Sequence, residues 1–175
     1  MISSEQLATM IGQIVVPTLP IPIQCVDEES PEMPYLKAVA SEAPAAWKDF
    51  AARPLAAYLP TFMGIVVFTR QFHRLTRVAL TFHDKKKLMA SDLMMKPLKK
   101  VLNHEINHYI QHRHLITKIG VFKGTEAFSQ LVTIGTYLTN PLENNSRQAE
   151  KEPELAAAAV PSIMDALIEE YHLVP

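Results

Sequence analysis

Two histidines four residues apart, with a glutamate directly after the first, are the densest group of chemically active side chains in the sequence. They form the motif His104-Glu105-Ile106-Asn107-His108, an H-E-x-x-H pattern. On an α-helix, residues four apart lie on one face, so the two imidazoles can converge on one metal ion. Glu105 is turned partly around the helix, close enough to handle the proton of a water molecule at that metal. The pattern predicts a metal site with a glutamate beside it.

The residues around this motif predict the helix that it needs. Pro97 suits a first helical turn, because its fixed φ fits there and its missing N–H would be unpaired anyway. Gly120 is a plausible end of the helix. Between them, apolar side chains recur at intervals of three and four residues, which is typical of an amphipathic helix; they are Leu98, Val101, Leu102, Ile106, Tyr109 and Ile110. The two histidines therefore fall in the middle of a predicted helix.

A hydrolytic zinc site takes three protein ligands and leaves one position for water. His114, ten residues after His104, is one candidate for the third ligand. That spacing works where a glycine bends the chain sharply after the second histidine. Here Gln111 occupies the bending position and the helical pattern continues. On an unbroken helix, His114 points away from the other two histidines, and we therefore disfavour it.

Glu126 is the better candidate for the third ligand. It follows a turn that we expect between Gly120 and Gly124, with Thr125 as a possible N-cap of a second helix. A short loop makes two helices antiparallel neighbours. Such a loop would bring an early residue of the second helix beside the first, so that a carboxylate meets the two imidazoles.

At these residues the sequence resembles the gluzincin branch of the zincin metallopeptidases. The resemblance rests on His-Glu-Ile-Asn-His and on Gly-Thr-Glu-Ala-Phe-Ser-Gln at 124–130, which is similar to the Asn-Glu-Ala-x-Ser-Asp around the glutamate ligand of thermolysin-like members. The resemblance implies zinc as the cofactor and a peptide or protein as the substrate. It implies that Glu105 activates water for attack on a peptide carbonyl. The implied zinc ligands are His104, His108 and Glu126.

The chain departs from the thermolysin-like pattern at two positions near the proposed glutamate ligand. Thr125 replaces the usual Asn, and Gln130 replaces the Asp that orients a ligand histidine. Gln130 could still accept an imidazole N–H from behind a metal ligand, without the charge that raises ligand basicity. Tyr109 and His112, on the same helix as the motif, are possible contacts to the substrate or the transition state. Little chain follows, so a compact zincin with weak or narrow activity is expected.

Composition is that of an ordinary soluble globular protein. The 175 residues are 48% hydrophobic and 20% charged, and the formal net charge is −1, which gives no argument for nucleic-acid binding. The single Cys25 excludes an internal disulfide and a cysteine-rich zinc module, and favours a cytoplasmic location. The longest apolar run, at 62–68, is far shorter than the roughly 20 residues that span a bilayer, so no membrane anchor is expected. Oligomeric state is left open.

The sequence predicts an α+β fold, a mostly helical, compact, zincin-like domain with a small sheet preceding the active-site helix. All 175 residues are assigned to one domain. Its predicted parts are a proline-rich N-terminal segment at 1–60 packed on a catalytic core at 61–139, an exposed connection at 140–154 and a C-terminal helix at 161–172. Within these parts we expect a helix from Ser3 or Ser4 to Ile11, an edge strand at 21–25, two short helices in 35–59, and strands at 64–69 and 74–82.

Two other function classes fit parts of the sequence. Glu105-x-x-His108 and Glu169-x-x-His172 are two copies of the E-x-x-H unit that di-metal carboxylate helical bundles use. In the other class, the protein is not an enzyme, and its zinc only stiffens a binding or structural protein. Metal identity and stoichiometry separate the first alternative from a one-zinc peptidase, and a closed site without a water position would favour the second.

Overall fold

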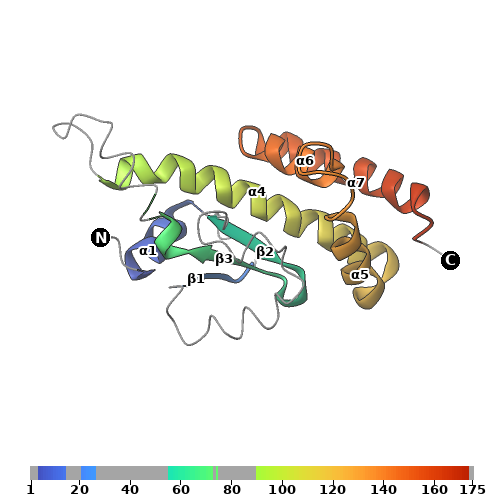
Figure 1. The fold of residues 1–175 in the computed structure, drawn as a ribbon, viewed down its shortest axis with the longest axis horizontal. Coiled ribbons are helices and arrows are strands. Elements are labelled where there is room, and N and C mark those ends of the chain that lie inside the picture. Colours follow the sequence, from blue (N-terminus) through green and yellow to red (C-terminus); the bar gives the residue numbers. More distant parts are fainter. Residues whose placement is uncertain (1–3, 15–20, 27–54, 73, 75–89, 174–175) are drawn as a thin grey trace. The chain divides into compact units, whose positions relative to one another are not determined.

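The computed structural model describes residues 4–14, 21–26, 55–72, 74 and 90–173 (Figure 1). The chain divides into two compact units. One consists of residues 1–57 and 65–99, and the other of residues 58–64 and 100–175. That the 175 residues form one domain, with 1–60 packed on 61–139, stays a prediction.

The first unit contains a short helix and most of a small sheet. Helix α1 (Ser4–Ile14) buries Leu7, Met10 and Ile11, which lie at helical spacing on one face. The sheet has the strand order β1-β3-β2, from strands β1 (Ile23–Val26), β2 (Ala56–Leu59) and β3 (Gly64–Phe68). Strand β1 is parallel to β3, and β3 is buried along its whole length, as a central strand rich in β-branched residues should be. The prediction of a mostly helical α+β fold with a small sheet before the motif helix is confirmed.

Several predicted elements of this unit can be compared with the structure. The N-terminal helix, the edge strand near Cys25 and the strand at 64–69 are confirmed, each within a few residues. The prediction of helix up to residue 59 is wrong, because Ala56–Leu59 is strand β2. Pairing in the sheet outweighs the helical preference of its alanines, since propensity is a weak prior against tertiary context. Residues 35–54 and 75–82, where the other predicted helix and strand fall, lie outside the described residues.

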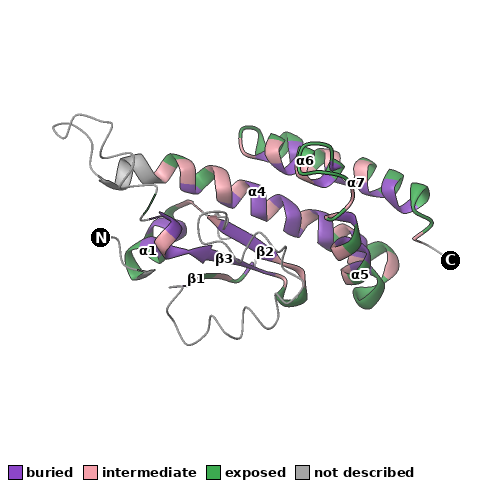
Figure 2. Ribbon diagram, viewed as in Figure 1, coloured by how far each residue is buried: buried purple, intermediate pink, exposed green. Residues whose placement is uncertain are grey.

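The second unit is mostly helical and includes the tip between β2 and β3, where the short 3-10 helix η4 (Pro60–Phe62) lies. It takes in α4 (Ala90–Ile119) from Lys100 onward, together with the helices α5 (Val121–Leu131), α6 (Pro141–Ala149) and α7 (Pro153–Glu170). Helix α7 contacts α6 and carries one buried stripe, drawn in purple in Figure 2. The stripe consists of Ala156, Val160, Met164, Leu167 and Ile168. Over the described parts of the chain, none of the helices has the length and apolar character needed to cross a membrane.

The helix that carries the motif is longer than predicted. Helix α4 ends at Ile119, directly before Gly120, as expected, but it begins at Ala90, and Pro97 lies inside it. The prediction that Pro97 opens the helix is therefore wrong. Proline costs a helix one hydrogen bond, yet the helix continues through it into Leu98 and Leu102, both fully buried. Burial of these side chains offsets that cost.

The predicted exposed connection at 140–154 is a buried helix over much of its length. Helix α6 starts at Pro141, after the N-cap Asn140, and buries Leu142, Asn145, Ser146 and Ala149. The prediction is wrong for 141–149, because it relied on polar composition alone, whereas residues 151–154 are exposed as expected. The C-terminal helix also begins earlier than predicted, at 153 rather than 161, and passes through a proline without ending.

The helix after the motif helix begins inside the predicted glycine-bracketed turn. Helix α5 starts at Val121, directly after Gly120, whose φ of 87° needs glycine. Gly124 is therefore inside a helix, and the prediction of Thr125 as an N-cap is wrong. A Cβ on Gly124 would lie 2.8 Å from the backbone N of Ile116. Gly124 is thus the point at which α5 approaches the backbone of α4.

Candidate metal centre

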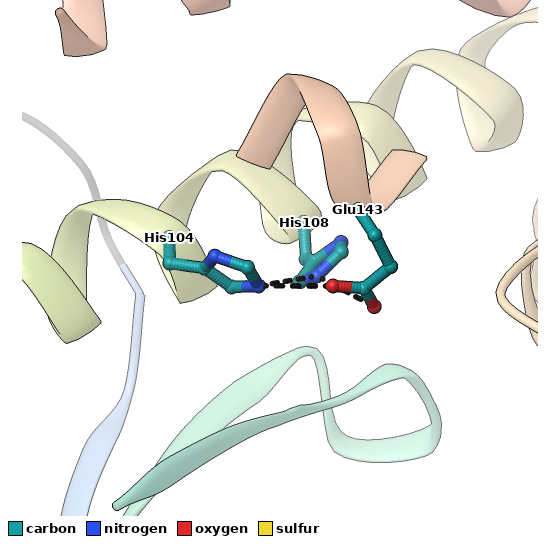
Figure 3. Close-up of side chains that lie close together, drawn as sticks. All are labelled: His104, His108 and Glu143. Carbon is teal, nitrogen blue, oxygen red and sulfur yellow. Dashed lines mark hydrogen bonds and ion pairs between the residues drawn. The ribbon is translucent and has the colours of Figure 1, made fainter. Parts of the chain in front are cut away.

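Three side chains from two helices of the second unit converge on one point (Figure 3). They are His104 and His108 from α4 and Glu143 from α6. The Nε2 atoms of the histidines are 3.2 Å apart. The carboxylate of Glu143 places Oε2 3.2 Å from Nε2 of His104, and Oε1 3.4 Å from Nε2 of His108. In the part of the chain that the structure describes, this is the one group of His, Cys, Asp and Glu with the geometry to hold a metal ion.

These separations fit the size of a zinc site. Zinc is bound tetrahedrally by imidazole nitrogen and carboxylate oxygen at about 2.0–2.2 Å, so two ligand atoms on the same ion lie about 3.3 Å apart. The three observed separations, 3.2, 3.2 and 3.4 Å, agree with that length. Two neutral imidazoles and one carboxylate are also a usual ligand set for zinc in hydrolytic sites. The residues present therefore fit the metal that the H-E-x-x-H motif predicts.

The hydrogen bonds at the far side of the site leave the converging atoms available. Nδ1 of His104 lies 3.3 Å from Oε1 of Glu150, and a carboxylate can only accept. The ring proton of His104 therefore belongs on Nδ1, and Nε2 presents a lone pair toward the group. Oε2 of Glu143 is buried without a hydrogen-bond partner. The lone pair on Nε2 of His104 and the unpartnered Oε2 of Glu143 therefore face each other, and a cation bound between them would satisfy both atoms.

Electrostatics point the same way. Burial raises the pKa of Glu143, but its close contacts with His104 and His108 outweigh burial and lower the pKa to about 2. Burial lowers the pKa of His104, yet the carboxylates of Glu143, Glu105 and Glu150 raise it above its ordinary value overall. Glu143 is therefore ionised at neutral pH, and its carboxylate supplies a negative charge that a cation at this point would neutralise.

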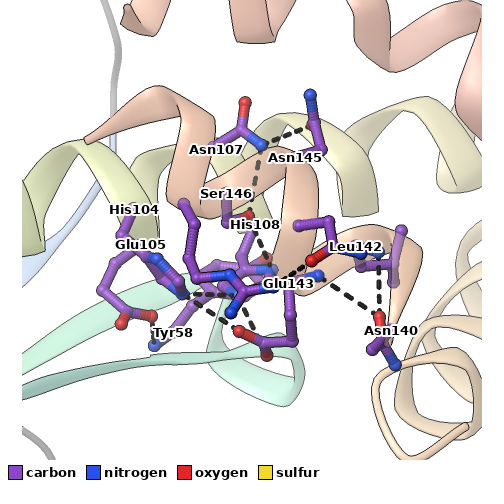
Figure 4. A network of polar contacts seen from close by, with 12 residues as sticks. Tyr58, His104, Glu105, Asn107, His108, Asn140, Leu142, Glu143, Asn145 and Ser146 are labelled. Carbon is purple, nitrogen blue, oxygen red and sulfur yellow. Dashed lines mark hydrogen bonds and ion pairs between the residues drawn. The ribbon is translucent and has the colours of Figure 1, made fainter. Parts of the chain in front are cut away.

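Glu105, the glutamate of the motif, is buried beside the two histidines and outside the three-residue group. Its Oε2 accepts a hydrogen bond of 2.6 Å from the backbone N–H of Tyr58, in β2 (Figure 4). Burial raises its pKa, although the nearby His108 and His104 and the Tyr58 hydrogen bond lower it. Tyr58 is itself fixed, because its hydroxyl lies 2.7 Å from Nδ1 of His112. The carboxylate of Glu105 is thus held in one place next to the ligands.

The structure does not bring Glu126, the third ligand predicted from the sequence, to the two histidines. Glu126 is exposed on α5 and is not part of the metal group. Gln130, the predicted partner behind a ligand histidine, is exposed as well. Because α5 begins at Val121, the two polar side chains fall outside its buried face, which carries Gly124, Ala127, Phe128 and Leu131. Glu143, from the segment predicted as an exposed connection, takes the place expected for Glu126.

The predicted substrate contacts are also wrong, because neither side chain is accessible. Tyr109 and His112 are buried, and the rings of both pack edge-on against Tyr58. They belong to an aromatic cluster inside the second unit. His114 is not part of the metal group, as expected, and pairs with Asp165 at 2.8 Å.

Tyr137, which the sequence interpretation overlooked, lies at the edge of the site. Its ring stacks on His104, with 6.5 Å between ring centroids and 21° between ring planes. The guanidinium of Arg147 lies 5.1 Å from the centroid of the Tyr137 ring and donates to the carbonyl of Leu138 at 3.2 Å. Tyr137 and Leu138 are 56% and 70% exposed, so they form an accessible apolar edge beside a metal ligand.

The segment that supplies Glu143 does carry a recognisable helix start. Asn140 is an N-cap whose Oδ1 accepts from the backbone N–H groups of Leu142 and Glu143, at 2.8 and 3.2 Å. Pro141 follows at the first helical position, and a glutamate two residues later matches the preference for acidic side chains there. The pair Asn-Pro followed by Leu-Glu could have predicted α6, and with it a carboxylate on a second helix.

Comparison with protein-family models, curated proteins and solved structures finds no match to this chain. The second E-x-x-H unit, at Glu169 and His172, is exposed at the end of α7 and is not part of the metal group. The di-metal alternative would need this unit beside the first. The site's own geometry is therefore the basis for assigning a function.

Proposed function

We propose that the protein is a zinc-dependent metallopeptidase that hydrolyses peptide bonds. The observation that carries the proposal is the agreement between the three ligand separations, 3.2, 3.2 and 3.4 Å, and the spacing of atoms around a tetrahedral zinc ion. His104, His108 and Glu143 would hold the metal. Three protein ligands leave a fourth position, which is the pattern of catalytic rather than structural zinc.

Zinc bound by these residues supplies Lewis acidity, which polarises a carbonyl group and lowers the pKa of water to about 7. Glu105 is the general base that takes the proton from the attacking water and later gives it to the leaving amine. Its position supports this role, because it is buried next to the ligands and one of its oxygens is anchored by the N–H of Tyr58. The anchored carboxylate stays oriented while a proton moves to and from its other oxygen.

Tyr137 is the substrate contact in this proposal, in place of Tyr109 and His112. A peptide that reaches His104 from the accessible side meets the stacked ring of Tyr137 and the exposed Leu138. Arg147 holds this edge in position through the ring of Tyr137 and the carbonyl of Leu138. An exposed apolar edge of this kind favours peptides with an apolar side chain near the cleaved bond.

The test combines metal analysis with a substrate search. We expect one zinc per chain, lost in His104→Ala and His108→Ala, because two remaining ligands rarely hold zinc. A peptide library identifies a cleaved substrate, and Glu105→Gln then lowers its hydrolysis by about 100-fold or more with zinc retained. Glu126→Gln, at an exposed glutamate on α5, is the matched control and leaves both quantities unchanged. Full zinc occupancy in His104→Ala, or full activity in Glu105→Gln, would overturn the proposal.

One observation favours a second candidate, a protein in which zinc is structural. His104 and His108 are only 8% and 6% exposed, and a closed site suits a structural ion. In that case zinc raises the thermal stability of the protein, no peptide in the library is cleaved, and Glu105→Gln changes nothing but stability. The two candidates therefore differ in the library assay, whereas metal content is the same in both.

A further inference from the structure

Gln111, one turn after His108 on α4, is completely buried, and its Oε1 lies 2.9 Å from Nδ1 of His108. We infer that Gln111 is a positioning residue that keeps the ring proton of His108 on Nδ1 and so presents Nε2 to the metal. This inference rests on the proposed metal site. It gives Gln111 the orienting role that the sequence interpretation gave to Gln130.

The orientation of the Gln111 side-chain amide is fixed by its neighbours. Its Nε2 donates to the backbone carbonyl of Leu142 at 3.1 Å and to Oδ1 of Asn145 at 3.0 Å. A carbonyl oxygen can only accept, so the nitrogen of Gln111 must face Leu142, and the oxygen must face His108. The neutral ring of His108 can satisfy that oxygen only with a proton on Nδ1.

Asn145 is oriented in the same way, by a carbonyl of α7. Its Nδ2 donates to the backbone carbonyl of Ala156 at 3.1 Å, which turns its Oδ1 toward Gln111 and Asn107. Two backbone carbonyls, one on α6 and one on α7, therefore set the direction of the amide hydrogen bonds that lead to His108. The backbone carbonyls of Leu142 and Ala156 thus determine which ring nitrogen of His108 carries no proton.

Ser146 shows why Gln111 is needed. Its hydroxyl oxygen lies 3.3 Å from Nδ1 of His108 and also accepts from the side-chain amides of Asn107 and Gln111. A hydroxyl can donate as well as accept, so Ser146 alone could donate to Nδ1 and move the ring proton to Nε2. In that state His108 could not bind a metal through Nε2. The oxygen of Gln111 is closer and accepts only, so it prevents this outcome.

A polar network at this depth is destabilising unless its groups are paired. Figure 4 shows Asn107, Asn145 and Ser146 together behind His108, and all three are buried. Burying amide and hydroxyl groups costs free energy unless each one finds a partner, whereas apolar side chains would pack there without that requirement. In this network Oδ1 of Asn107 is buried without a partner, whereas the side-chain polar atoms of Gln111, Asn145 and Ser146 are hydrogen-bonded, and the bonds from Gln111 and Ser146 reach His108.

The experiment reads the proton on His108 directly by ¹⁵N NMR of histidine-labelled, metal-free protein, with the His108 resonances assigned through His108→Gln. In the native protein we expect Nδ1 to carry the proton. Gln111→Leu, which keeps the side-chain size but removes the acceptor, should shift the proton toward Nε2 and weaken zinc binding by about 10- to 100-fold. Gln111→Glu keeps an acceptor toward His108 and should keep the Nδ1 proton, but it loses the donor to Leu142 and Asn145, so its stability should fall while its proton position stays native. Gln130→Leu, at an exposed glutamine, is the matched control.

A native, metal-free protein with no proton on Nδ1 of His108 would overturn the inference without any variant, so poor folding of Gln111→Leu cannot rescue it; a second proton on Nε2, which lies 3.4 Å from Oε1 of Glu143, would not. A folded Gln111→Leu protein with the native proton position and native zinc affinity would overturn it as well. The outcome is separate from that of the proposed function. A native protein that binds no zinc refutes the metal centre, whereas the position of the proton on His108 is measured without metal.

Discussion

Replacing Glu143 by glutamine is the sharpest test of the metal centre, because the sequence pointed to a different glutamate. The structure places the oxygens of Glu143 3.2 and 3.4 Å from Nε2 of the two histidines, the separation expected between two ligands of one zinc ion, whereas Glu126 is exposed on another helix. Glu143→Gln removes the only anionic ligand of the group and keeps the size of the side chain. Zinc affinity should therefore fall sharply.

The size of the effect follows from the role of the residue. Loss of a hydrogen-bond partner behind a ligand typically weakens metal binding about 10- to 100-fold, so loss of a direct ligand should exceed about 100-fold. At a zinc concentration about 100 times the native dissociation constant, binding stabilises the native protein by about 2.7 kcal/mol. A variant that binds about 100-fold more weakly gains about 0.4 kcal/mol under the same conditions. For a chain of this length, the difference corresponds to roughly 5–9 °C in the zinc-induced rise of the melting temperature.

The assay is competition with a chromophoric zinc chelator, supported by melting curves with and without zinc. Glu126→Gln is the matched control, since it makes the same chemical change on an exposed surface. We expect native affinity in Glu126→Gln and a small zinc-induced shift in Glu143→Gln. Native zinc affinity in Glu143→Gln would refute the ligand assignment. Loss of affinity in Glu126→Gln would mean that α5 packs as the sequence interpretation expected.

Three further predictions concern residues around the site and the packing of the helices. In a urea titration, Gly124→Ala should lower the free energy of unfolding of the second unit by about 1–3 kcal/mol, because the new Cβ would meet the backbone of Ile116. Gly12→Ala is the control: its position inside α1 has open space, so the free energy of unfolding should rise by up to about 1 kcal/mol. Burial lowers the pKa of His112 to about 4, against about 6.5 when unfolded, so the stability that its neutral ring provides is complete above about pH 6.5 and is lost as pH falls toward about 4. His112→Gln should remove at most about 3 kcal/mol of that pH dependence, measured as the difference in unfolding free energy between pH 7 and pH 4. If a peptide substrate is found, Tyr137→Ala should raise KM more than it lowers kcat, and an equal fall of kcat and kcat/KM would argue against a role in substrate binding.

Half of the candidate metal site could be located from the sequence because that half is local. His104, Glu105 and His108 lie within five residues of one helix, so the helical repeat alone fixes their relation. The end of α4 before Gly120 was predictable for the same reason. The strand β3 could be predicted from its β-branched residues and its glycine start, since a buried central strand has a recognisable composition.

The third ligand could not be predicted in the same way, because it depends on where the next helix begins. A turn ending at Gly124 would have put Glu126 early in α5, but the chain resumes a helix directly after Gly120. The close approach at Gly124 is the physical reason, since a residue without a Cβ lets α5 pack on the backbone of α4. In the sequence, Gly124 predicts a turn. In the structure, the same residue allows a close contact between α5 and α4. Only the contact accounts for the exposed position of Glu126.

Helix α6 shows how composition misled the interpretation, and why its polar residues are there. Its sequence, Pro-Leu-Glu-Asn-Asn-Ser-Arg-Gln-Ala, has few apolar side chains, which is typical of an exposed segment. Three of its polar residues nevertheless face the site. Glu143 joins the two histidines, while Asn145 and Ser146 lie in the network behind His108. A helix that binds a metal and orients a ligand needs polar side chains on its buried face, and hydrogen bonds rather than apolar burial then stabilise that face. The low hydrophobicity of α6 fits the polar contacts of its buried face, and it is the property that concealed Glu143 in the sequence.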